Sequence, residues 1–438
     1  MNIELKPTKT SYCDVAVFGA GPAGIAAAYT AAREGLKTVL IEPTNKIGGL
    51  MAACPGMMLG AGYPLDTCIG GFFENFVDRL YHMSKAEKRI CAIPEFGKEV
   101  IYDHEAAITL LYQMLEEAGV DLRLQTLPLE VEVQDNCITG VAVADMTGIT
   151  ALEACVYLDC TGNGDIAHKA GVPSQVGNKD GLMMGGTVTF FMENVDWDKA
   201  FAGDDIYFTQ YAKKGIKEGR LHPDIPEIYF IKAFRPGSVF FNTVTMAGVD
   251  GRDPKSVQQQ SLEARKRCHQ LAEFCKSDIP GFEHAWLNYL GPLMGVRETR
   301  KLEGMHQITI EEIARETKFE DGIVACDNPI DDVFRGETRE YSNDRALREG
   351  GYYTIPFRSL VPKKVKNLMF AGRNISADTY AFASVRGMPQ CMLMGESVAL
   401  AAGLAMKNHC TVQEVDPQQV VQGMMAHGVR GIGGQPLV

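Results

Sequence analysis

The chain has 438 residues, of which 46% are hydrophobic and 22% charged, and its formal net charge at pH 7 is −12. This composition is typical of a globular protein and excludes a disordered tail, a collagen repeat and a small disulfide scaffold. The acidic balance and the lack of a Lys/Arg-rich run argue against nucleic acid as a partner, because nucleic-acid affinity comes mainly from basic patches.

The spacing of cysteine and histidine disfavours several kinds of site. The twelve cysteines include no Cys-x-x-Cys pair, which zinc ribbons, iron–sulfur ligand runs and thioredoxin-type motifs need. The nine histidines are scattered and form no His-Glu-x-x-His motif, so we expect no metal site. We therefore expect reduced thiols and a cytoplasmic location.

The first predicted elements lie in an apolar stretch, residues 15–32, that superficially resembles a signal peptide. Glycines interrupt this stretch, and the pattern predicts instead a buried strand over 13–18, a glycine turn and a helix that runs to Gly35. No other apolar run reaches about 18 residues, so we expect no membrane-spanning helix.

The glycines of this turn have the Gly-x-Gly-x-x-Gly spacing of a dinucleotide site. The first permits the tight turn, the second lets a pyrophosphate approach the backbone, and the third lets helix and strand pack closely. Residues 37–41 predict the next strand, and an acid stands at its end, where a carboxylate accepts hydrogen bonds from a ribose. The expected cofactor contacts in this region are Gly19, Gly21, Pro22, Ala23, Gly24, Glu42 and Pro43.

A second glycine pair follows the acid and indicates which dinucleotide is bound. The segment that contains Lys46, Gly48, Gly49 and Leu50 is a turn that a nicotinamide site does not need, whereas a flavin site needs the chain to turn beside its longer cofactor. On these residues the chain resembles the FAD-dependent oxidoreductases of the glutathione-reductase-like superfamily. The resemblance implies FAD as the cofactor and these four residues among its contacts.

The next segments continue the resemblance. Residues 72–82 and 104–118 have helical spacing, and residues 122–143 alternate as short strands with a turn at Asp135 and Asn136. The family places a β-meander there, on the adenine side of the flavin. Residues 156–165 read as a strand that runs into a turn, and they resemble a family segment whose implied flavin contacts here are Thr161, Gly162 and Asp165.

The pattern changes over about 177–353. Residues 186–191, 227–231 and 239–244 look like strands, and residues 255–276 form a charged amphipathic helix. We assign this part to a substrate domain that rests over the flavin.

Two arginines of this domain are candidate catalytic residues. Residues 295–300 resemble a segment that recurs in the family as a helix near the substrate. In a helix, Arg297 and Arg300 would share one face and clamp a carboxylate or phosphate, and structural salt bridges with Glu298 or Glu303 are the alternative.

The last segments complete the flavin signature. Residues 367–376 predict a strand that ends in a glycine turn, and an apolar helix follows over about 389–406. The family points the N-terminus of that helix at the flavin pyrimidine, where its dipole stabilises negative charge. The implied contacts are Gly372, Arg373, Met388, Gln390 and Cys391. Between the two segments, Tyr380 stands where many relatives have histidine, and it either hydrogen-bonds the substrate or is a packed aromatic.

The motifs together imply an α/β fold, in which a Rossmann-like FAD-binding domain of parallel sheet and β-meander is interrupted by an α+β substrate domain. This is the bacterial type of the family with an inserted substrate domain. We expect the FAD-binding domain over 1–176 and 354–438, and the substrate or cap domain over 177–353.

Two features of the superfamily's disulfide reductases are missing. Cys54 has no partner four residues on, which argues against a disulfide mechanism, although a covalent link from this thiol to the flavin stays open. No second glycine fingerprint occurs between 181 and 350, so we expect no dedicated NAD domain. Electrons then enter from the substrate or from a partner, with direct NADH docking left open.

The sequence therefore predicts an FAD-dependent oxidoreductase that exchanges a hydride between flavin N5 and a small polar organic substrate. A flavoprotein subunit that passes electrons to a partner within a complex is the alternative. An RNA-modifying flavoprotein is a weaker third possibility, because the net charge of −12 opposes RNA binding.

Overall fold

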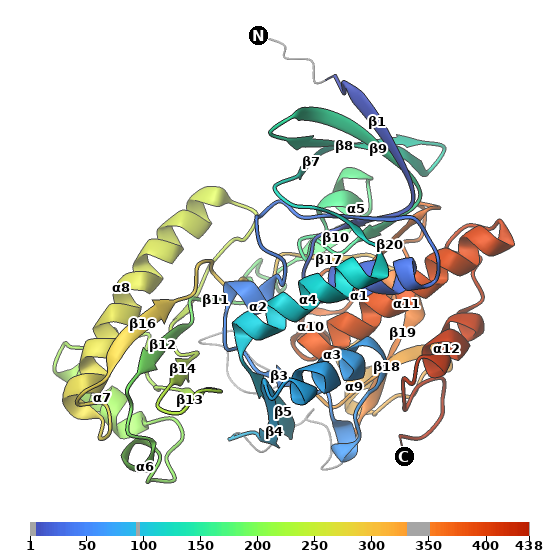
Figure 1. Ribbon diagram of the computed structural model, residues 1–438. Helices are drawn as coiled ribbons and strands as arrows, with labels where there is room; N and C mark the ends of the chain where they lie inside the picture. Colours follow the sequence, from blue (N-terminus) through green and yellow to red (C-terminus); the bar gives the residue numbers. More distant parts are fainter. Residues whose placement is uncertain (1–5, 93–96, 331–350, 438) are drawn as a thin grey trace.

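The chain is built around a seven-stranded sheet and a second, four-stranded sheet (Figure 1). The computed structural model describes residues 6–92, 97–330 and 351–437. Within these residues the large sheet has seven strands, in the order β6-β2-β1-β9-β8-β7 with β20 beside β9. They are β1 (Lys9–Phe18), β2 (Thr38–Ile41), β6 (Asp121–Arg123), β7 (Leu127–Gln134), β8 (Cys137–Asp145), β9 (Gly148–Asp159) and β20 (Leu368–Phe370).

The large sheet is parallel on one side and antiparallel on the other. β1 runs parallel to β2 and β9, β2 to β6, and β20 to β9. β7, β8 and β9 form an antiparallel meander, and its first turn holds Asp135 and Asn136 with φ of +53° and +62°. The predicted combination of parallel sheet, β-meander and turn is confirmed.

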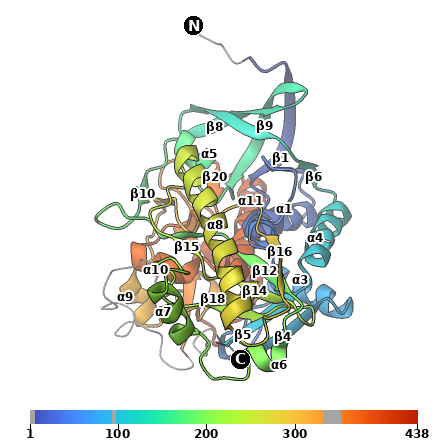
Figure 2. The ribbon, with the colours of Figure 1, turned by 90° about the vertical axis from the view of Figure 1, so that its left-hand side faces the viewer.

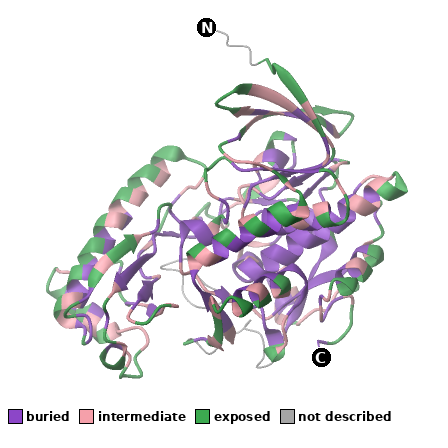
Figure 3. Cartoon of the chain, viewed as in Figure 1, coloured by how far each residue is buried: buried purple, intermediate pink, exposed green. Residues whose placement is uncertain are grey.

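Two long helices cover one face of the parallel strands. They are α1 (Pro22–Arg33) and α11 (Met388–Asn408), and most of their residues are buried (Figure 3). Burial on both faces explains why β1 and β2 read as apolar runs, since Val15–Phe18 and Val39–Ile41 are almost fully buried. A Cβ on Gly395 would lie 2.0 Å from the Ala23 carbonyl oxygen, so this glycine lets the two helices approach closely.

Further helices and a small sheet surround this core. The predicted helices over 72–82 and 104–118 are confirmed as α3 (Gly71–His82) and α4 (His104–Ala118). The small sheet has the order β3-β5-β4, with β3 (Leu59–Gly60), β4 (Ala86–Ile90) and β5 (Lys98–Tyr102). The remaining elements of this part are α2 (Leu50–Ala53), α5 (Asp165–Lys169), α9 (Ile310–Ala314), β18 (Gly322–Cys326), β19 (Tyr353–Pro356), α10 (Thr379–Val385) and α12 (Pro417–Ala426).

The second sheet has its own hydrophobic core and lies to one side of the first (Figures 1 and 2). It is antiparallel, in the order β13-β14-β12-β16, and stacked aromatic rings fill its core, among them Phe190 and Phe241 with centroids 4.4 Å apart. Its strands are β12 (Phe190–Glu193), β13 (Phe230–Lys232), β14 (Val239–Phe241) and β16 (Trp286–Leu290). Its helices are α6 (Trp197–Ala200), α7 (Thr209–Lys217) and α8 (Pro254–Asp278), the last of which matches the predicted amphipathic helix.

The helix expected over 295–300 is wrong. Gly295 bridges to Thr187 in a β-bridge, and Arg300 opens strand β17 (Arg300–Leu302), so the segment is extended. β17 pairs with β10 (Ser174–Val176), while β11 (Gly186–Thr187) pairs with β15 (Thr245–Met246). The bridge to Thr187 and the β10–β17 ladder hold the segment in extended backbone, a tertiary effect that local spacing does not report.

Part of the segment assigned to the substrate domain packs elsewhere. Buried residues of α9 and β18 belong to the hydrophobic core that holds α1 and α11, not to the core of the second sheet. The stretch 331–350 of that assigned domain lies outside the described residues. No helix in the described ranges is long and apolar enough to cross a membrane.

Candidate functional site

One cavity of about 1660 Å³ joins the two parts of the molecule. Its wall includes residues from four segments that are far apart in the chain, and these are the segments that carry the expected flavin motifs. Tyr289 of β16, residues of the loops around the second sheet and residues of the segment 292–297 complete the wall. The predicted contacts that line it are Gly19, Gly21, Pro22, Ala23, Glu42, Lys46, Gly49, Leu50, Thr161, Gly162, Gly372, Arg373, Met388 and Cys391.

The backbone at Gly21 is shaped for a ligand that approaches closely. A Cβ on Gly21 would have as its nearest neighbour the Gly49 Cα, 3.8 Å away, so the space in front of it is open. Gly21 is also the N-cap of α1 and has no side-chain cap, which leaves the first N–H groups of the helix directed outward. A helix N-terminus with free N–H groups suits a pyrophosphate, so the residues present fit this part of FAD.

Three of the predicted contacts in this region do not line the cavity. A Cβ on Gly24 would lie 1.8 Å from the Gly19 carbonyl oxygen, and a Cβ on Gly48 would lie 2.4 Å from Ile108 Cδ1. Gly24 therefore allows the glycine turn to close tightly, and Gly48 allows α4 to pack against the second glycine pair. Pro43 is exposed on the surface.

Glu42 stands at the edge of the cavity and is held there by the backbone. Its carboxylate accepts hydrogen bonds from the Ala20 N–H at 2.8 Å and from the Thr44 N–H at 2.9 Å, and the residue is 9% exposed. Two N–H donors stabilise the charge, and the remaining lone pairs of both oxygens are available to hydroxyl donors. This arrangement fits the expected ribose contact.

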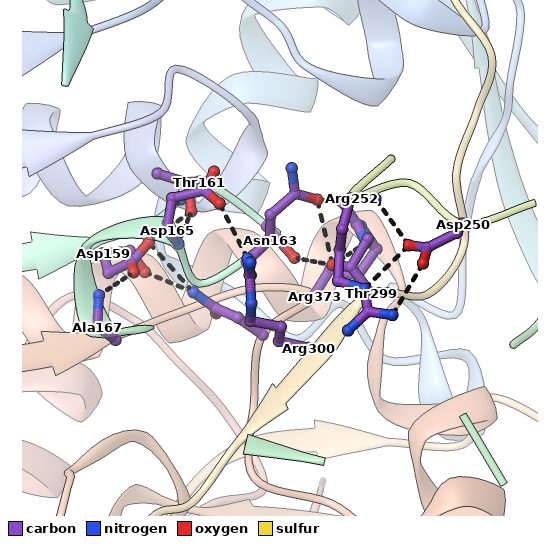
Figure 4. A network of polar contacts seen from close by, with 12 residues as sticks. Asp159, Thr161, Asn163, Asp165, Ala167, Asp250, Arg252, Thr299, Arg300 and Arg373 are labelled. Carbon is purple, nitrogen blue, oxygen red and sulfur yellow. Dashed lines mark hydrogen bonds and ion pairs between the residues drawn. The ribbon is translucent and has the colours of Figure 1, made fainter. Parts of the chain in front are cut away.

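A polar network supports the third motif (Figure 4). The fully buried Asp159 accepts from the Thr161 N–H and hydroxyl at 3.1 and 2.7 Å and from the Ala167 N–H at 2.8 Å. Burial raises the pKa of Asp159 to about 6, although these bonds oppose the shift. The network therefore fixes the turn that carries Thr161 and Gly162 into the wall.

Arg373 places a guanidinium beside the same turn. It donates to Thr299 Oγ1 at 3.1 Å and to Asn163 Oδ1 at 2.8 Å, and both partners are neutral. Burial, and then the nearby Arg386, lowers the pKa of Arg373 to about 10, so the group stays cationic at pH 7. A cation at the cavity wall stabilises an anionic group bound there.

Helix α11 begins at the cavity wall. Its N-cap, Gly387, has no side-chain cap, and Gly387, Met388 and Cys391 line the wall. The predicted contact Gln390 instead points away, because its Nε2 donates to the Ala61 carbonyl at 2.5 Å. The N-terminus of this 21-residue helix thus faces the cavity, as the family resemblance implied for the flavin pyrimidine.

The structure separates the two candidate arginines. Arg297 lines the cavity and donates to the Gly185 carbonyl and to Thr187 Oγ1. Arg300 points to the other side of the extended segment, where it pairs with Asp165 at 3.1 Å (Figure 4). The expected clamp by both side chains is therefore wrong, and Asp165 is a partner of Arg300 that does not line the cavity.

Tyr380 does not line the cavity either. It lies in the first turn of α10, where its N–H donates to the Asp378 carboxylate, and its ring packs against the main hydrophobic core. This position matches the packed aromatic of the two alternatives considered for it.

The cysteines give no reactive pair. All twelve are free thiols, and burial raises the pKa of Cys54, which lines the cavity, to about 11. Within residues 6–92, 97–330 and 351–437, no group of three or more His, Cys, Asp or Glu side chains is arranged to hold a metal ion.

Several lining residues have no sequence signal. Glu99 lies on β5, Tyr207 in the loop before α7, Tyr229 just before β13 and Asn242 just after β14. They meet at the cavity through the packing of the second sheet against the small sheet. Glu99 on β5 is a buried acid, which is unusual, but its burial is known only from the structure.

Comparison with known proteins shows the family of the chain. The family model described as FAD dependent oxidoreductase matches residues 14–424. A digeranylgeranylglycerophospholipid reductase from Picrophilus torridus is 28% identical over 210 residues, which is 46% of this chain and 51% of that protein. A 4-oxocyclohex-2-ene-1-carboxylate 5-dehydrogenase from Sinomonas cyclohexanicum is 30% identical over 22% of this chain and 17% of its own length. The match thus spans about half the length of the reductase.

Solved structures show the same fold. A geranylgeranyl bacteriochlorophyll reductase-like protein from Thermoplasma acidophilum superposes with a TM-score of 0.51 at 15% identity, covering 96% of this chain and 83% of the other. A p-nitrophenol 4-monooxygenase from Pseudomonas putida superposes with a TM-score of 0.52 at 12% identity, covering 96% and 89%.

Proposed function

The chain belongs to the family of FAD-dependent oxidoreductases, and from this premise we propose that it exchanges a hydride between flavin N5 and a small polar organic substrate. The observation that carries the proposal is a cavity whose wall contains both the flavin motifs and residues of β16 and of the loops around the second sheet. A substrate that enters between the second sheet and the glycine turns would meet the cofactor in that space.

Different residues of the chain would hold the different parts of FAD and of the substrate. The N-terminus of α1 and the glycines opposite it would hold the pyrophosphate, Glu42 the ribose, and the N-terminus of α11 the flavin ring. When bound, FAD supplies the hydride chemistry of its isoalloxazine. Arg297 would orient an anionic group of the substrate, and the second sheet would exclude water from the space.

The three relatives that are named as reductases support the reducing direction of the exchange, whereas one shorter match is named as a dehydrogenase. The reductases are named digeranylgeranylglycerophospholipid reductase and match over 46% of this chain. That lipid is the substrate named for those proteins, and for this chain we propose only the reaction class.

We also propose a division into two units, an FAD-binding unit over 1–176 and 354–438 and a substrate unit over 177–353. Separate hydrophobic cores support two units. Because α9 and β18 pack in the core of the FAD-binding unit, we place the C-terminal boundary of the substrate unit nearer to residue 300.

Anaerobic spectroscopy tests the proposed reaction. The protein purified with FAD is mixed without oxygen with a panel of small polar metabolites, and the absorbance of the oxidised flavin is followed. The same panel is then applied to photoreduced protein. Bleaching or reoxidation by a small molecule supports the proposal, whereas reoxidation only by a partner protein would assign the chain to electron transfer within a complex.

A further inference from the structure

One end of the cavity lies beside the small sheet. There, Glu99 on β5 is 1% exposed and lines the cavity. One of its carboxylate oxygens, Oε1, accepts from Arg89 Nε at 2.8 Å. The other, Oε2, is buried and has no hydrogen-bond partner among the described residues.

A buried carboxylate oxygen without a partner is costly and rare in native proteins. A ligand in the cavity would remove that cost if it presented a hydrogen-bond donor. The ion pair with Arg89 already balances the charge of Glu99, and Arg89 is itself held by the Lys232 carbonyl at 2.7 Å. A neutral donor therefore suits the site better than a cation, which would leave an excess positive charge in a largely buried place.

A second unsatisfied group lies in the same wall. The buried Oδ1 of Asn242, in the loop after β14, also has no partner among the described residues. An amide can turn to present either its oxygen or its NH₂ group, so Asn242 can accept from a ligand hydroxyl or donate to it. Glu99, in contrast, can only accept.

Aromatic and apolar side chains flank these two groups. Tyr207 and Tyr229 both line the cavity, with ring centroids 6.0 Å apart, and Met57 and Met58 continue the wall toward the flavin motifs. Burial and the nearby Cys91 and Glu99 raise the pKa of Tyr229, so its hydroxyl stays protonated. These side chains would cover a flat or apolar carrier.

Backbone pairing and one hydrogen bond connect the Glu99 end of the cavity to the place expected for the flavin ring. Gly60 pairs with Glu99 between β3 and β5, and the next residue, Ala61, accepts from Gln390 in the first turn of α11. Glu99 therefore lies on the strand next to β3, and the residue that follows β3 contacts the first turn of α11.

We propose that Glu99, Asn242, Tyr207 and Tyr229 form a substrate subsite that binds a neutral, hydroxyl-bearing group on an aromatic or apolar carrier. This inference rests on the proposed function and adds a chemical class to its substrate. The subsite selects for a group that donates a hydrogen bond to Glu99 Oε2.

Binding of matched probes to the oxidised FAD-loaded protein tests the subsite. The probes are benzyl alcohol, benzyl methyl ether and benzylamine, and binding is measured by calorimetry and by perturbation of the flavin spectrum. We expect the alcohol to bind about tenfold or more tightly than the ether, because the ether leaves the carboxylate oxygen unpaired. Equal binding of alcohol and ether, or tighter binding of the amine, would overturn the proposal.

Glu99→Gln sharpens the test. In this variant Arg89 donates to the amide oxygen of the new side chain. The NH₂ group of that side chain then takes the place of Oε2, and it donates equally well to an ether oxygen and to an alcohol oxygen. The alcohol-to-ether preference should fall to about onefold, while Glu227→Gln, an exposed acid on the same cavity, should leave it unchanged. If Glu99→Gln fails to fold, Asn242→Leu replaces it, and a retained affinity for the alcohol in that variant counts against the subsite.

The controls separate this inference from the proposed function. The flavin content of each preparation, read from its absorbance, and the anaerobic panel test the oxidoreductase. The probe preference needs no turnover. If the protein reacts with metabolites but binds the alcohol and the ether equally, only the proposed subsite is overturned.

Discussion

Individual glycines of the first motif have different roles although their spacing is shared. Gly21 faces open space in the cavity, whereas Gly24 is pressed against the Gly19 carbonyl. One glycine leaves room for a ligand, and the other leaves room for the protein itself. The two roles can be separated by substitution.

Gly21→Val should fold but be purified without FAD, because its side chain would project into the space of the pyrophosphate. Gly24→Val should instead lower the free energy of unfolding by about 3 kcal/mol or prevent folding, because backbone must move to make room. Flavin absorbance and thermal unfolding of both variants measure this. Normal flavin content in Gly21→Val would contradict the assignment of the motif.

The two arginines likewise differ in the residues they contact. Arg297→Ala should keep FAD but weaken binding of an anionic probe such as benzoate by about tenfold, since a cavity-lining cation is lost. Arg300→Ala should leave benzoate binding unchanged and cost about 1 kcal/mol of stability, because it releases the partly exposed Asp165. Spectral titration and denaturant unfolding distinguish them. Equal losses of benzoate binding in both variants would restore the two-arginine clamp.

At the scale of elements, the pairing of α1 with α11 determines the shape of the cofactor end. Both helices begin with a glycine N-cap and both N-termini reach the cavity. The small residues along α1 allow this close alignment, and Gly395 packs directly against the backbone of Ala23. Any side chain there would push the two N-termini apart.

Gly395→Ala should therefore lower the free energy of unfolding by about 2 kcal/mol, despite the higher helix propensity of alanine. Gly403→Ala on the same helix is the matched control. Its Cβ would only touch Leu36 Cδ1 at 3.7 Å, so its stability should stay equal or rise by up to about 1 kcal/mol. The prediction fails if the two variants unfold at the same denaturant concentration.

At the scale of the whole molecule, a charged network joins four elements. His427, at the end of α12, pairs through Nδ1 with Glu396 of α11 at 2.8 Å and through Nε2 with Glu34, just after α1, at 3.3 Å. Glu396 Oε2 also accepts from the Phe72 N–H of α3. The hydrogen bond to Glu396 is the main reason that the pKa of His427 is raised above 6.5.

Because the pKa of His427 is higher in the folded protein, its contribution to stability is full below about pH 6.5 and is lost as the pH rises through the folded value. His427→Gln should cost about 1 kcal/mol at pH 6, and the difference from the unaltered protein should shrink toward pH 9. Denaturant unfolding at several pH values measures it. A difference that grows with pH would contradict the paired, protonated state.

The sequence by itself determined the flavin end of the protein. The strand, helix and glycine motifs around residues 13–53, 156–165 and 367–391 are local patterns, and each needs a residue type for a reason that holds within a few residues, such as a tight turn or a free helix N-terminus. For that reason the predicted meander and long helices also match the structure.

Only the tertiary structure decided the end of the cavity that we propose to bind substrate. The segment 295–300 is extended because it bridges to Thr187 and feeds β17, so its two arginines point to opposite sides. Glu99 and Asn242 meet at one cavity because separate sheets pack together, and neither carries a local signal. Long-range packing chooses among states that the local sequence leaves close in energy, and it places the side chains that face the cavity.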